Sequence, residues 1–214
     1  MRVLVFAGGD PTPAEVAADL PAEAFVIAAD SGAAHARTAG RAVDVLVGDL
    51  DSIDPSLALA LESQGTRVDR HPAAKDRTDL ALALDAALAL EPSAITVVGG
   101  HGGRLDHLVA NALLLAADDY AGIAVDARMG PATVTVVRGR REIRGPVGDL
   151  VSLLPVGGPA TGVTTEGLMF PLHGATLRPG TTWGVSNQLV EASGAVTVST
   201  GVVLVIQPGA LGDL

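Results

Sequence analysis

Short apolar runs alternate with longer segments of mixed polarity over the first 130 residues of the chain. Five of these runs have the length and β-branched content of buried parallel strands, and they cover residues 3–7, 25–28, 43–47, 94–98 and 123–125. Between them lie segments with helical spacing of apolar positions, at 13–20, 33–39, 55–63, 78–90 and 105–116. This alternation predicts a mostly parallel sheet with helices on its faces.

The pattern changes near Gly130-Pro131. Beyond it the helical spacing disappears, and short β-rich stretches separated by glycine and proline follow at 133–138, 150–154, 162–165, 168–171, 188–191, 196–199 and 202–206. Such a series favours a small antiparallel β-sandwich or barrel. The sequence therefore predicts an α/β fold in two domains. Residues 1–130 would form the mostly parallel sheet flanked by helices, and residues 131–214 would form an antiparallel β-sandwich.

The composition narrows the classes of protein to which the chain can belong. Hydrophobic residues make up 48% of its 214 residues, which allows a substantial core and excludes a disordered or low-complexity chain. Aromatic residues are only 2% and the net charge is −10, so we expect no nucleic-acid partner. The absence of cysteine excludes disulfides, zinc–thiolate centres and cysteine nucleophiles. No export signal or membrane span is evident, and we expect a cytoplasmic protein without a membrane partner.

The acidic residues are concentrated in the first predicted domain. Residues 1–130 hold 19 acidic residues against 9 basic ones, whereas residues 131–214 hold 5 of each. One explanation is solubility. The other is that several aspartates converge on a divalent metal ion, and the positions of the aspartates must decide between the two.

Glycine and aspartate recur where the predicted parallel strands end. In open α/β sheets, ligands bind outside the carboxyl ends of the strands. Glycine lets backbone N–H groups approach phosphate oxygens closely, whereas bare carboxylates repel phosphate unless a hard cation lies between them. The combination therefore indicates a site for a metal–nucleotide polyphosphate. The segments with this composition are Ala29–Gly32, Gly48–Ser52, Gly99–His107 and, if residues 66–68 form a further strand, Lys75–Asp79.

Asp49 and Asp51 are candidate metal ligands because they are two residues apart. In a strand, side chains at i and i+2 point to the same side, so both carboxylates could reach one ion. The alternative is that one of them caps the following helix. Asp54, directly before Pro55, already fits the helix cap, which leaves Asp49 and Asp51 available for metal.

Two further segments offer contacts to phosphate. Lys75 is the only lysine of the chain, and it either acts as a point charge toward phosphate or lies by chance on a solvated loop. Gly99–Gly103 resembles a phosphate-binding loop that enters a helix, but it matches neither a Walker A motif nor a dinucleotide fingerprint. Helical spacing places Arg104, His107 and Asn111 on one face. The last two of these either contact the ligand or hold the loop.

The second predicted domain offers Trp183 and the pair Ser186-Asn187 as binding residues. A single tryptophan in an aromatic-poor chain can stack on a flat heterocycle. Serine and asparagine side chains can hydrogen-bond ring nitrogens or an exocyclic amine. The alternative interpretation makes Trp183 a core residue and Ser186-Asn187 a turn.

Taken in order, these segments resemble the thiamine pyrophosphokinase family. The matching segments extend from about Asp30 to Ile206, and their ordered set is specific although each segment is short. The family also combines an α/β domain with a β-sandwich. Trp183 and the Gly99–His101 stretch depart from the family pattern. The matching segments are Ala28–Ala33, Gly48–Ile53, Lys75–Leu80, Gly99–Asn111, Gly167–Leu172 and Gly184–Asn187.

The resemblance implies an enzyme that transfers a pyrophosphoryl group from Mg·ATP to the hydroxyl of thiamine and releases AMP. It also implies a homodimer, with each site between the α/β domain of one subunit and the sandwich of the other. By position, it implies catalytic roles for Asp49, Asp51, Asp79, Arg104 and Asp106, and Mg²⁺ binding by Asp49, Asp51 and Asp79. ATP would be bound by Asp30, Ser31, Gly32, Ser52, Lys75, Thr78, Gly102 and Gly103, and thiamine by Trp183, Ser186 and Asn187.

Several alternatives stay open at this point. Asp79 and Asp106 are both candidates for the group that orients or deprotonates the acceptor hydroxyl. A related enzyme that pyrophosphorylates a hydroxymethylpterin would share the aspartate and glycine loops and differ in the acceptor pocket. A non-catalytic nucleotide- or thiamine-sensing module is a second alternative, but it would not need so many carboxylates around phosphate. In the third, a structural domain, the acidity would serve only solubility.

Overall fold

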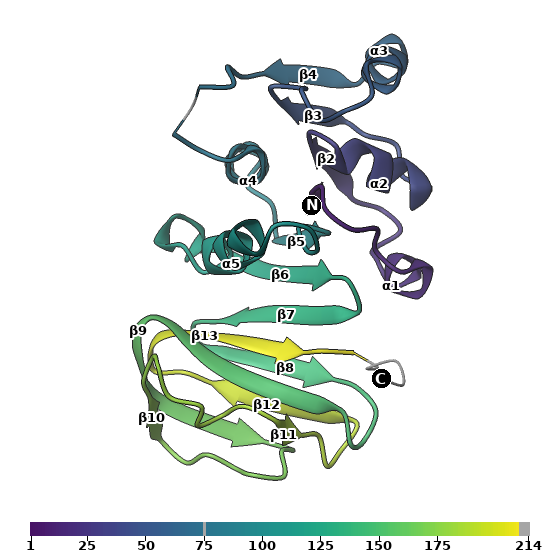
Figure 1. Ribbon diagram of the computed structural model, residues 1–214. Helices are drawn as coiled ribbons and strands as arrows, with labels where there is room; N and C mark the ends of the chain where they lie inside the picture. Colours follow the sequence, from purple (N-terminus) through teal and green to yellow (C-terminus); the bar gives the residue numbers. More distant parts are fainter. Residues whose placement is uncertain (75, 210–214) are drawn as a thin grey trace. The chain divides into compact units, whose positions relative to one another are not determined.

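The computed structural model describes residues 1–74 and 76–209, which fall into two compact units. The first unit comprises residues 1–115 and 122–130, and the second comprises residues 116–121 together with the chain from Pro131 onward. The five α-helices of the described residues all belong to the first unit, whereas the second is built mainly of strands (Figure 1).

Strands and helices alternate in the first unit. Its strands are β1 (Arg2–Phe6), β2 (Phe25–Ala29), β3 (Val45–Gly48), β4 (Arg67–Arg70), β5 (Ala94–Val98) and β6 (Ala124–Met129). Its helices are α1 (Ala14–Ala18), α2 (Gly32–Thr38), α3 (Pro55–Ser63), α4 (Asp79–Leu88) and α5 (Leu105–Leu114). The predicted cap of α3 is confirmed, since Asp54 accepts a hydrogen bond from Ser56 N at 2.8 Å, and Thr78 caps α4 by accepting one from Ala81 N at 3.3 Å.

The strands of the first unit lie in the order β4-β3-β2-β1-β5-β6, and every pairing among its described strands is parallel. The chain moves outward from β1 to β4 and then returns through α4 to β5, on the other side of β1. The direction of winding therefore reverses between β1 and β5. Open α/β sheets bind ligands at such a reversal, outside the carboxyl ends of the strands.

Small residues allow α2 to pack closely against the sheet. Ala33 and Ala36 of this helix are fully buried in a core cluster that also contains Leu4, Phe6 and Leu46. A Cβ at Gly32 would lie 2.2 Å from the carbonyl oxygen of Phe6, so only glycine fits at the start of α2. The loop between β2 and α2 is thereby held against the end of β1.

The second unit is an antiparallel assembly with the strand order β7-β13-β9-β12-β8, and two further strands, β10 and β11, also pair with β9. The bounds are β7 (Ala132–Val137), β8 (Arg140–Arg144), β9 (Leu150–Glu166), β10 (Ala175–Leu177), β11 (Asn187–Gln188), β12 (Ser193–Thr197) and β13 (Thr200–Gln207). Its core is a cluster of buried aliphatic side chains that includes Val151, Leu153, Val163, Leu177 and Val203.

Some predicted strand boundaries in the second unit were wrong. Residues 150–154 and 162–165 belong to the single strand β9, whose pairing with β13 shifts in register around Gly157 and Gly158 instead of ending there. Residues 168–171 form no strand, because only an isolated bridge joins Leu168 to Leu189. The strand β8 was missed because its sequence RREIR is mostly charged, although its single aliphatic residue, Ile143, is 3% exposed.

Residues 116–121 belong to the second unit although they precede β6 in sequence. The 3₁₀-helix η1 (Asp118–Tyr120) lies in this segment, and the side chain of Tyr120 is buried. The guanidinium of Arg138 donates hydrogen bonds to the carbonyl oxygens of Ala116 and Ala117 at 2.6 and 2.9 Å. One arginine at the end of β7 therefore holds a segment that the strand and helix pattern assigned to the first domain.

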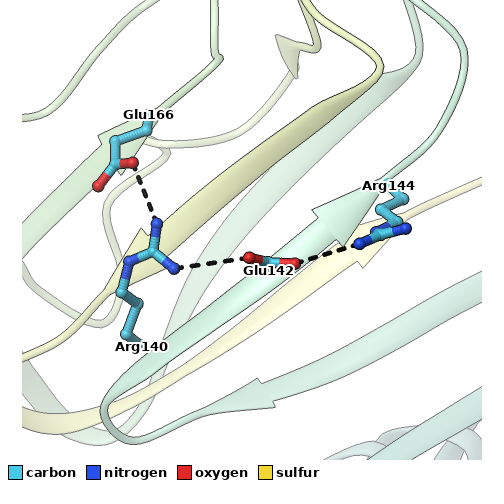
Figure 2. Close-up of polar contacts among 4 residues, drawn as sticks. All are labelled: Arg140, Glu142, Arg144 and Glu166. Carbon is cyan, nitrogen blue, oxygen red and sulfur yellow. Dashed lines mark hydrogen bonds and ion pairs between the residues drawn. The ribbon is translucent and has the colours of Figure 1, made fainter.

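The edge strand β8 carries a row of charges. Figure 2 shows Arg140, Glu142, Arg144 and Glu166, with Arg140 paired to Glu166 at 3.1 Å and Arg144 paired to Glu142 at 3.4 Å. These side chains are mostly exposed, so the ion pairs contribute little to stability. Charges on an edge strand discourage pairing with another chain.

None of the described helices has the length and apolar character needed to cross a membrane.

Candidate active site

A cavity of about 280 Å³ lies at the carboxyl ends of the strands in the first unit. It is formed by the loops that follow β1, β2, β3, β4 and β5, and by one face of α5. Its lining residues are Ala7, Gly8, Gly9, Ala29, Asp30, Ser31, Ser52, Thr78, Asp79, Leu80, Gly100, His101, Gly102, Gly103, Arg104, His107 and Asn111. The structure thus brings together most of the first-domain residues that the sequence indicated.

Asp30 is a buried carboxylate in the wall of this cavity. It is 5% exposed and has a left-handed backbone, with φ of 48°. One carboxylate oxygen accepts hydrogen bonds from the hydroxyl and the backbone N–H of Ser52. The other, Oδ1, is buried and has no hydrogen-bond partner among the described residues. Burial raises the pKa of Asp30, the hydrogen bond from Ser52 opposes this, and the neighbouring charge of Asp79 adds to it.

Asp30, Asp49 and Asp51 form a group of carboxylates. One oxygen from each lies within 4.8 Å of the others, which makes this a possible cation site. Asp49 and Asp51 do not lie in a strand, as strand alternation predicted, because β3 ends at Gly48 and both aspartates lie in the following loop. Leu50 between them has φ of 65°, and this left-handed turn brings the two carboxylates toward Asp30.

The unpartnered Oδ1 of Asp30 is the observation that tests whether these residues suit a metal ion. A buried carboxylate oxygen without a donor is costly, and a hard cation would satisfy it. Three carboxylates at close range also repel one another unless a positive charge lies among them. The donor set therefore fits a hard divalent cation.

Asp79 lies beside this group and also lines the cavity. Its Oδ1 would be 3.2 Å from a Cβ at Gly48, so the absence of a side chain at Gly48 leaves room for the carboxylate. Thr78 lines the cavity as well, and its hydroxyl caps α4. Asp79 is not part of the three-carboxylate group, and its place is on the neighbouring wall.

Two glycine loops pack tightly against each other at the reversal of winding. A Cβ at Gly9 would lie 2.1 Å from the carbonyl oxygen of His101, and one at Gly102 would lie 2.1 Å from the Asp10 carboxylate. Gly100 N donates to the carbonyl oxygen of Gly8 at 2.8 Å. Gly8 and Gly9 were not singled out from the sequence, although their place directly after the first strand is the signal that could have identified them.

Arg104 lines the cavity, but Asp106 does not. The two form an ion pair with two contacts, Nε to Oδ1 at 3.1 Å and Nη2 to Oδ2 at 2.5 Å. The hydrogen bond from Arg104 lowers the pKa of Asp106 to about 2. Both side chains are largely exposed, so Asp106 orients the guanidinium from outside the cavity.

The predicted helix face is confirmed, since His107 and Asn111 line the cavity together with Arg104. The side chain of Asn111 donates a hydrogen bond to the carbonyl oxygen of Gly100 at 2.9 Å. Of the two roles considered for Asn111, the hydrogen bond supports the one of holding the loop. Gly32, Asp49 and Asp51 do not line the cavity, and Lys75 lies outside the described residues.

A second cavity of about 280 Å³ lies in the second unit. Trp183 and Phe170 line it and are 57% and 63% exposed, so neither is a core residue. The remaining lining residues are Leu172, Thr182, Gly184, Val185 and Asn187. Two of the few aromatic side chains of the chain therefore stand at one exposed hollow.

Both polar atoms of the Asn187 side chain form hydrogen bonds within the protein. Its Oδ1 accepts a hydrogen bond from Phe170 N at 3.0 Å, and its Nδ2 donates one to the carbonyl oxygen of Phe170 at 2.8 Å. The residue is 4% exposed, so its amide holds the Phe170 loop in place. Ser186 has φ of 59°, donates its backbone N–H to the Ser152 hydroxyl at 3.1 Å, and is not among the lining residues.

Two family models match the chain at the positions of the two cavities. The model "Thiamin pyrophosphokinase, catalytic domain" matches residues 18–125, which include the carboxylate group. The model "Thiamin pyrophosphokinase, vitamin B1 binding domain" matches residues 138–205, which include the aromatic cavity. The chain belongs to the thiamine pyrophosphokinase family. The resemblance drawn from the sequence motifs is thus confirmed.

Relatives in the thiamine pyrophosphokinase family match most of the chain. The thiamine pyrophosphokinase of Bacillus subtilis is 28% identical over 192 residues, which are 85% of this chain and 86% of that protein. Thiamine pyrophosphokinase 3 of Oryza sativa is 30% identical over 176 residues, which are 73% of this chain and 62% of that protein. These matches do not favour the pterin enzyme or the sensing module.

A crystal structure of thiamine pyrophosphokinase from Bacillus subtilis has the same fold. It matches with a TM-score of 0.86 at 26% sequence identity, and the match covers 99% of this chain and 100% of that one. The predicted fold class, a parallel α/β sheet followed by an antiparallel β-sandwich, is thereby confirmed.

Proposed function

We propose that the protein transfers a pyrophosphoryl group from ATP to the hydroxyl of thiamine, giving thiamine diphosphate and AMP. The observation that carries this proposal is the group Asp30, Asp49 and Asp51, with its unpartnered buried oxygen, beside two glycine loops. Asp30 also lines one cavity with Asp79 and the glycine loops, and carboxylates beside glycine loops suit a metal-bound polyphosphate better than a free anion. Family membership supplies the acceptor class.

The metal ion in this proposal is Mg²⁺. Asp30, Asp49 and Asp51 would hold it, with Asp79 on the neighbouring wall of the cavity. When bound, the ion neutralises phosphate charge and thereby favours phosphoryl transfer.

The residues of the chain itself then bind and orient the phosphate groups. Gly102 and Gly103 expose backbone near the cavity, and Arg104 presents a guanidinium that Asp106 keeps in one orientation. Lys75 remains a sequence-based candidate for a further phosphate contact. Transfer of this kind depends mainly on positioning and charge stabilisation, which is what these groups supply.

We propose that Asp79 accepts the proton of the acceptor hydroxyl. Asp79 lines the cavity, whereas Asp106 lies outside it in an ion pair with Arg104. With a pKa of about 2, the Asp106 carboxylate is also a weak base. An effective general base has a pKa near the working pH. These two observations support Asp79 over Asp106 for this role.

Thiamine fits the aromatic cavity of the second unit in this proposal. Its thiazolium ring is a flat cation, and aromatic faces attract such cations. Trp183 and Phe170 offer these faces, and Asn187 holds Phe170 where it is. The domain roles follow: residues 1–130 bind ATP and carry the catalytic groups, and residues 131–214 bind thiamine.

The proposal includes a cytoplasmic homodimer. Helix α5 has no buried residue, and Leu105, Val109 and Leu113, each four residues apart, are 72%, 50% and 51% exposed. An apolar face of this kind on a helix beside the catalytic cavity is suited to burial by a second copy of the chain. Sedimentation of the purified protein at a mass of two chains is the expected result.

The direct test is product identification by mass spectrometry after incubation with Mg·ATP and each acceptor. We expect AMP and thiamine diphosphate with thiamine, and no pyrophosphorylated product with 6-hydroxymethylpterin. AMP formation with the pterin and not with thiamine would overturn the proposal. Tight nucleotide binding by calorimetry without turnover on either acceptor would also overturn it.

A further inference from the structure

His101 stands in the middle of the glycine loop and is tied to two other segments. Its carbonyl oxygen accepts a hydrogen bond from Asp10 N at 2.8 Å. On either side of it along the loop, Gly99 N donates to the carbonyl oxygen of Arg128 and Gly102 packs against the Asp10 carboxylate. The backbone at His101 is therefore a fixed point from which Gly102 and Gly103 extend along the cavity wall.

The imidazole of His101 is packed against the end of β6. An added Cβ at Gly130 would lie 2.8 Å from Nε2 and 2.9 Å from Cδ2 of the ring. Only a residue without a side chain leaves room for the imidazole there. Nδ1 is buried and has no hydrogen-bond partner among the described residues. The ring thus fills space without using this polar atom.

The electrostatics argue against a role for His101 as a phosphate-binding cation. Burial lowers the pKa of its imidazole, the nearby His35 acts in the same direction, and Asp10 opposes the shift. The lowered pKa favours the uncharged form of the ring. Its contribution to the cavity is therefore its volume.

We propose that His101 is a positioning residue. Its imidazole, wedged against Gly130, holds the loop so that Gly102 and Gly103 present their backbone to the phosphate chain of ATP. This inference rests on the proposed function, because it takes the cavity to be the nucleotide site. It adds a residue that the family resemblance did not assign and that departs from the family pattern.

Substitutions at position 101 separate volume from hydrogen bonding. We expect His101→Ala to raise the KM for ATP about tenfold, because an error of about 1 Å in positioning can cost up to about a hundredfold. His101→Phe keeps the ring volume and should stay within about threefold of the parent. His101→Asn keeps a polar atom near the position of Nδ1 but loses the part of the ring that reaches Gly130, and it should resemble His101→Ala. The KM for thiamine should change less than twofold in all three.

Gly130→Ala tests the same contact from the other side. Its new methyl group would collide with the ring, so we expect an increase in the KM for ATP of about tenfold. In the double variant with His101→Ala the collision is absent, and the combined effect should fall well below the product of the two single effects. Gly40→Ala is the matched control, because Gly40 has a similar φ of 69° but nothing within 4 Å of the added methyl group.

The experiment measures steady-state kinetics between pH 6 and 8, and calorimetry with a non-hydrolysable ATP analogue and Mg²⁺. We expect the effect of His101→Ala to be the same across this pH range. The proposal is overturned if His101→Asn retains ATP affinity while His101→Phe loses it, if the two single effects multiply, or if the effect follows titration of an imidazole. Calorimetry measures the affinity for the ATP analogue even if the parent makes no thiamine diphosphate. The role of His101 and the proposed activity can therefore fail independently of each other.

Discussion

The two cavities differ in how their walls are held. In the first unit, Asp30 is 5% exposed and Ser52 hydrogen-bonds one of its oxygens, while glycine loops lock together nearby. In the second unit, the two aromatic side chains that line the cavity, Trp183 and Phe170, are 57% and 63% exposed to solvent. A site that places carboxylates together must be organised before the ligand arrives, because like charges repel. An aromatic site can gain its energy when the ligand covers it.

The largest effect should come from the carboxylates. We expect Asp49→Asn and Asp51→Asn each to lower kcat by about 10²-fold or more, because each removes a charge that the metal and phosphates require. Asp19→Asn is the control, since Asp19 is an exposed acid at the end of α1. Steady-state kinetics with ATP and thiamine measure the effect. Activity within threefold of the parent for both variants would remove the carboxylate group from the mechanism.

Trp183→Ala should affect the other cavity alone. We expect the KM for thiamine to rise about tenfold while the KM for ATP stays the same, because stacking on a cationic ring is worth about 1–2 kcal/mol. Trp183→Phe should recover part of the loss. Val190→Ala serves as control, because Val190 is a partly exposed apolar residue of the same unit that does not line the cavity. An unchanged KM for thiamine in Trp183→Ala would exclude stacking.

Asp106→Asn should have a smaller effect than Asp79→Asn. Loss of the ion pair loosens Arg104, so we expect the KM for ATP to rise about threefold. If Asp79 is the proton acceptor, Asp79→Asn lowers kcat by about 10²-fold. The acid limb of the kcat profile should be unchanged in Asp106→Asn, because the pKa of Asp106, about 2, lies below the working range. The reverse order of the two effects on kcat would exchange the roles.

The smallest effect is on stability, and its sign sharpens the contrast between the cavities. The pKa of Asp30 is raised by burial and by Asp79, so the native state loses stability as pH rises through that pKa. We expect Asp30→Asn to raise the Tm at pH 7 by about 2–4 °C, as about 1 kcal/mol does in a chain of this size. Below 3.8, the ordinary pKa of this carboxyl, the gain should vanish, because the group is then protonated in both the folded and the unfolded chain.

The metal provides the check on this stability difference. Mg²⁺ should raise the Tm of the parent more than that of Asp30→Asn, because a ligand stabilises the state that binds it. Thermal denaturation with and without Mg²⁺ measures the Tm difference between the two proteins and the change in each Tm when the metal binds. A lower Tm for Asp30→Asn without metal would contradict the repulsion among these carboxylates.

The sequence predicted the fold of the first unit better than that of the second. Strands β1, β2 and β5 are buried apolar runs, and their pattern is local, so their positions could be read directly. In the second unit, the glycines 157 and 158, where the pairing of β9 shifts in register, look in the sequence like the end of a strand. The strand β8 has a single aliphatic residue, so its sequence lacks an apolar pattern. Both strands exist because of their partners, and no local pattern indicates a partner.

The candidate site divides in the same way. The order of residues along the chain already indicates that aspartates and glycines follow the parallel strands, because strand ends and loop composition are local properties. The folded chain was needed to see that Asp30 joins Asp49 and Asp51, that Asp79 and not Asp106 lines the cavity, and that Asn187 holds Phe170. Distances between loops, burial and hydrogen-bond partners depend on segments far apart in the chain, and these properties decide whether a carboxylate or amide faces ligand or protein.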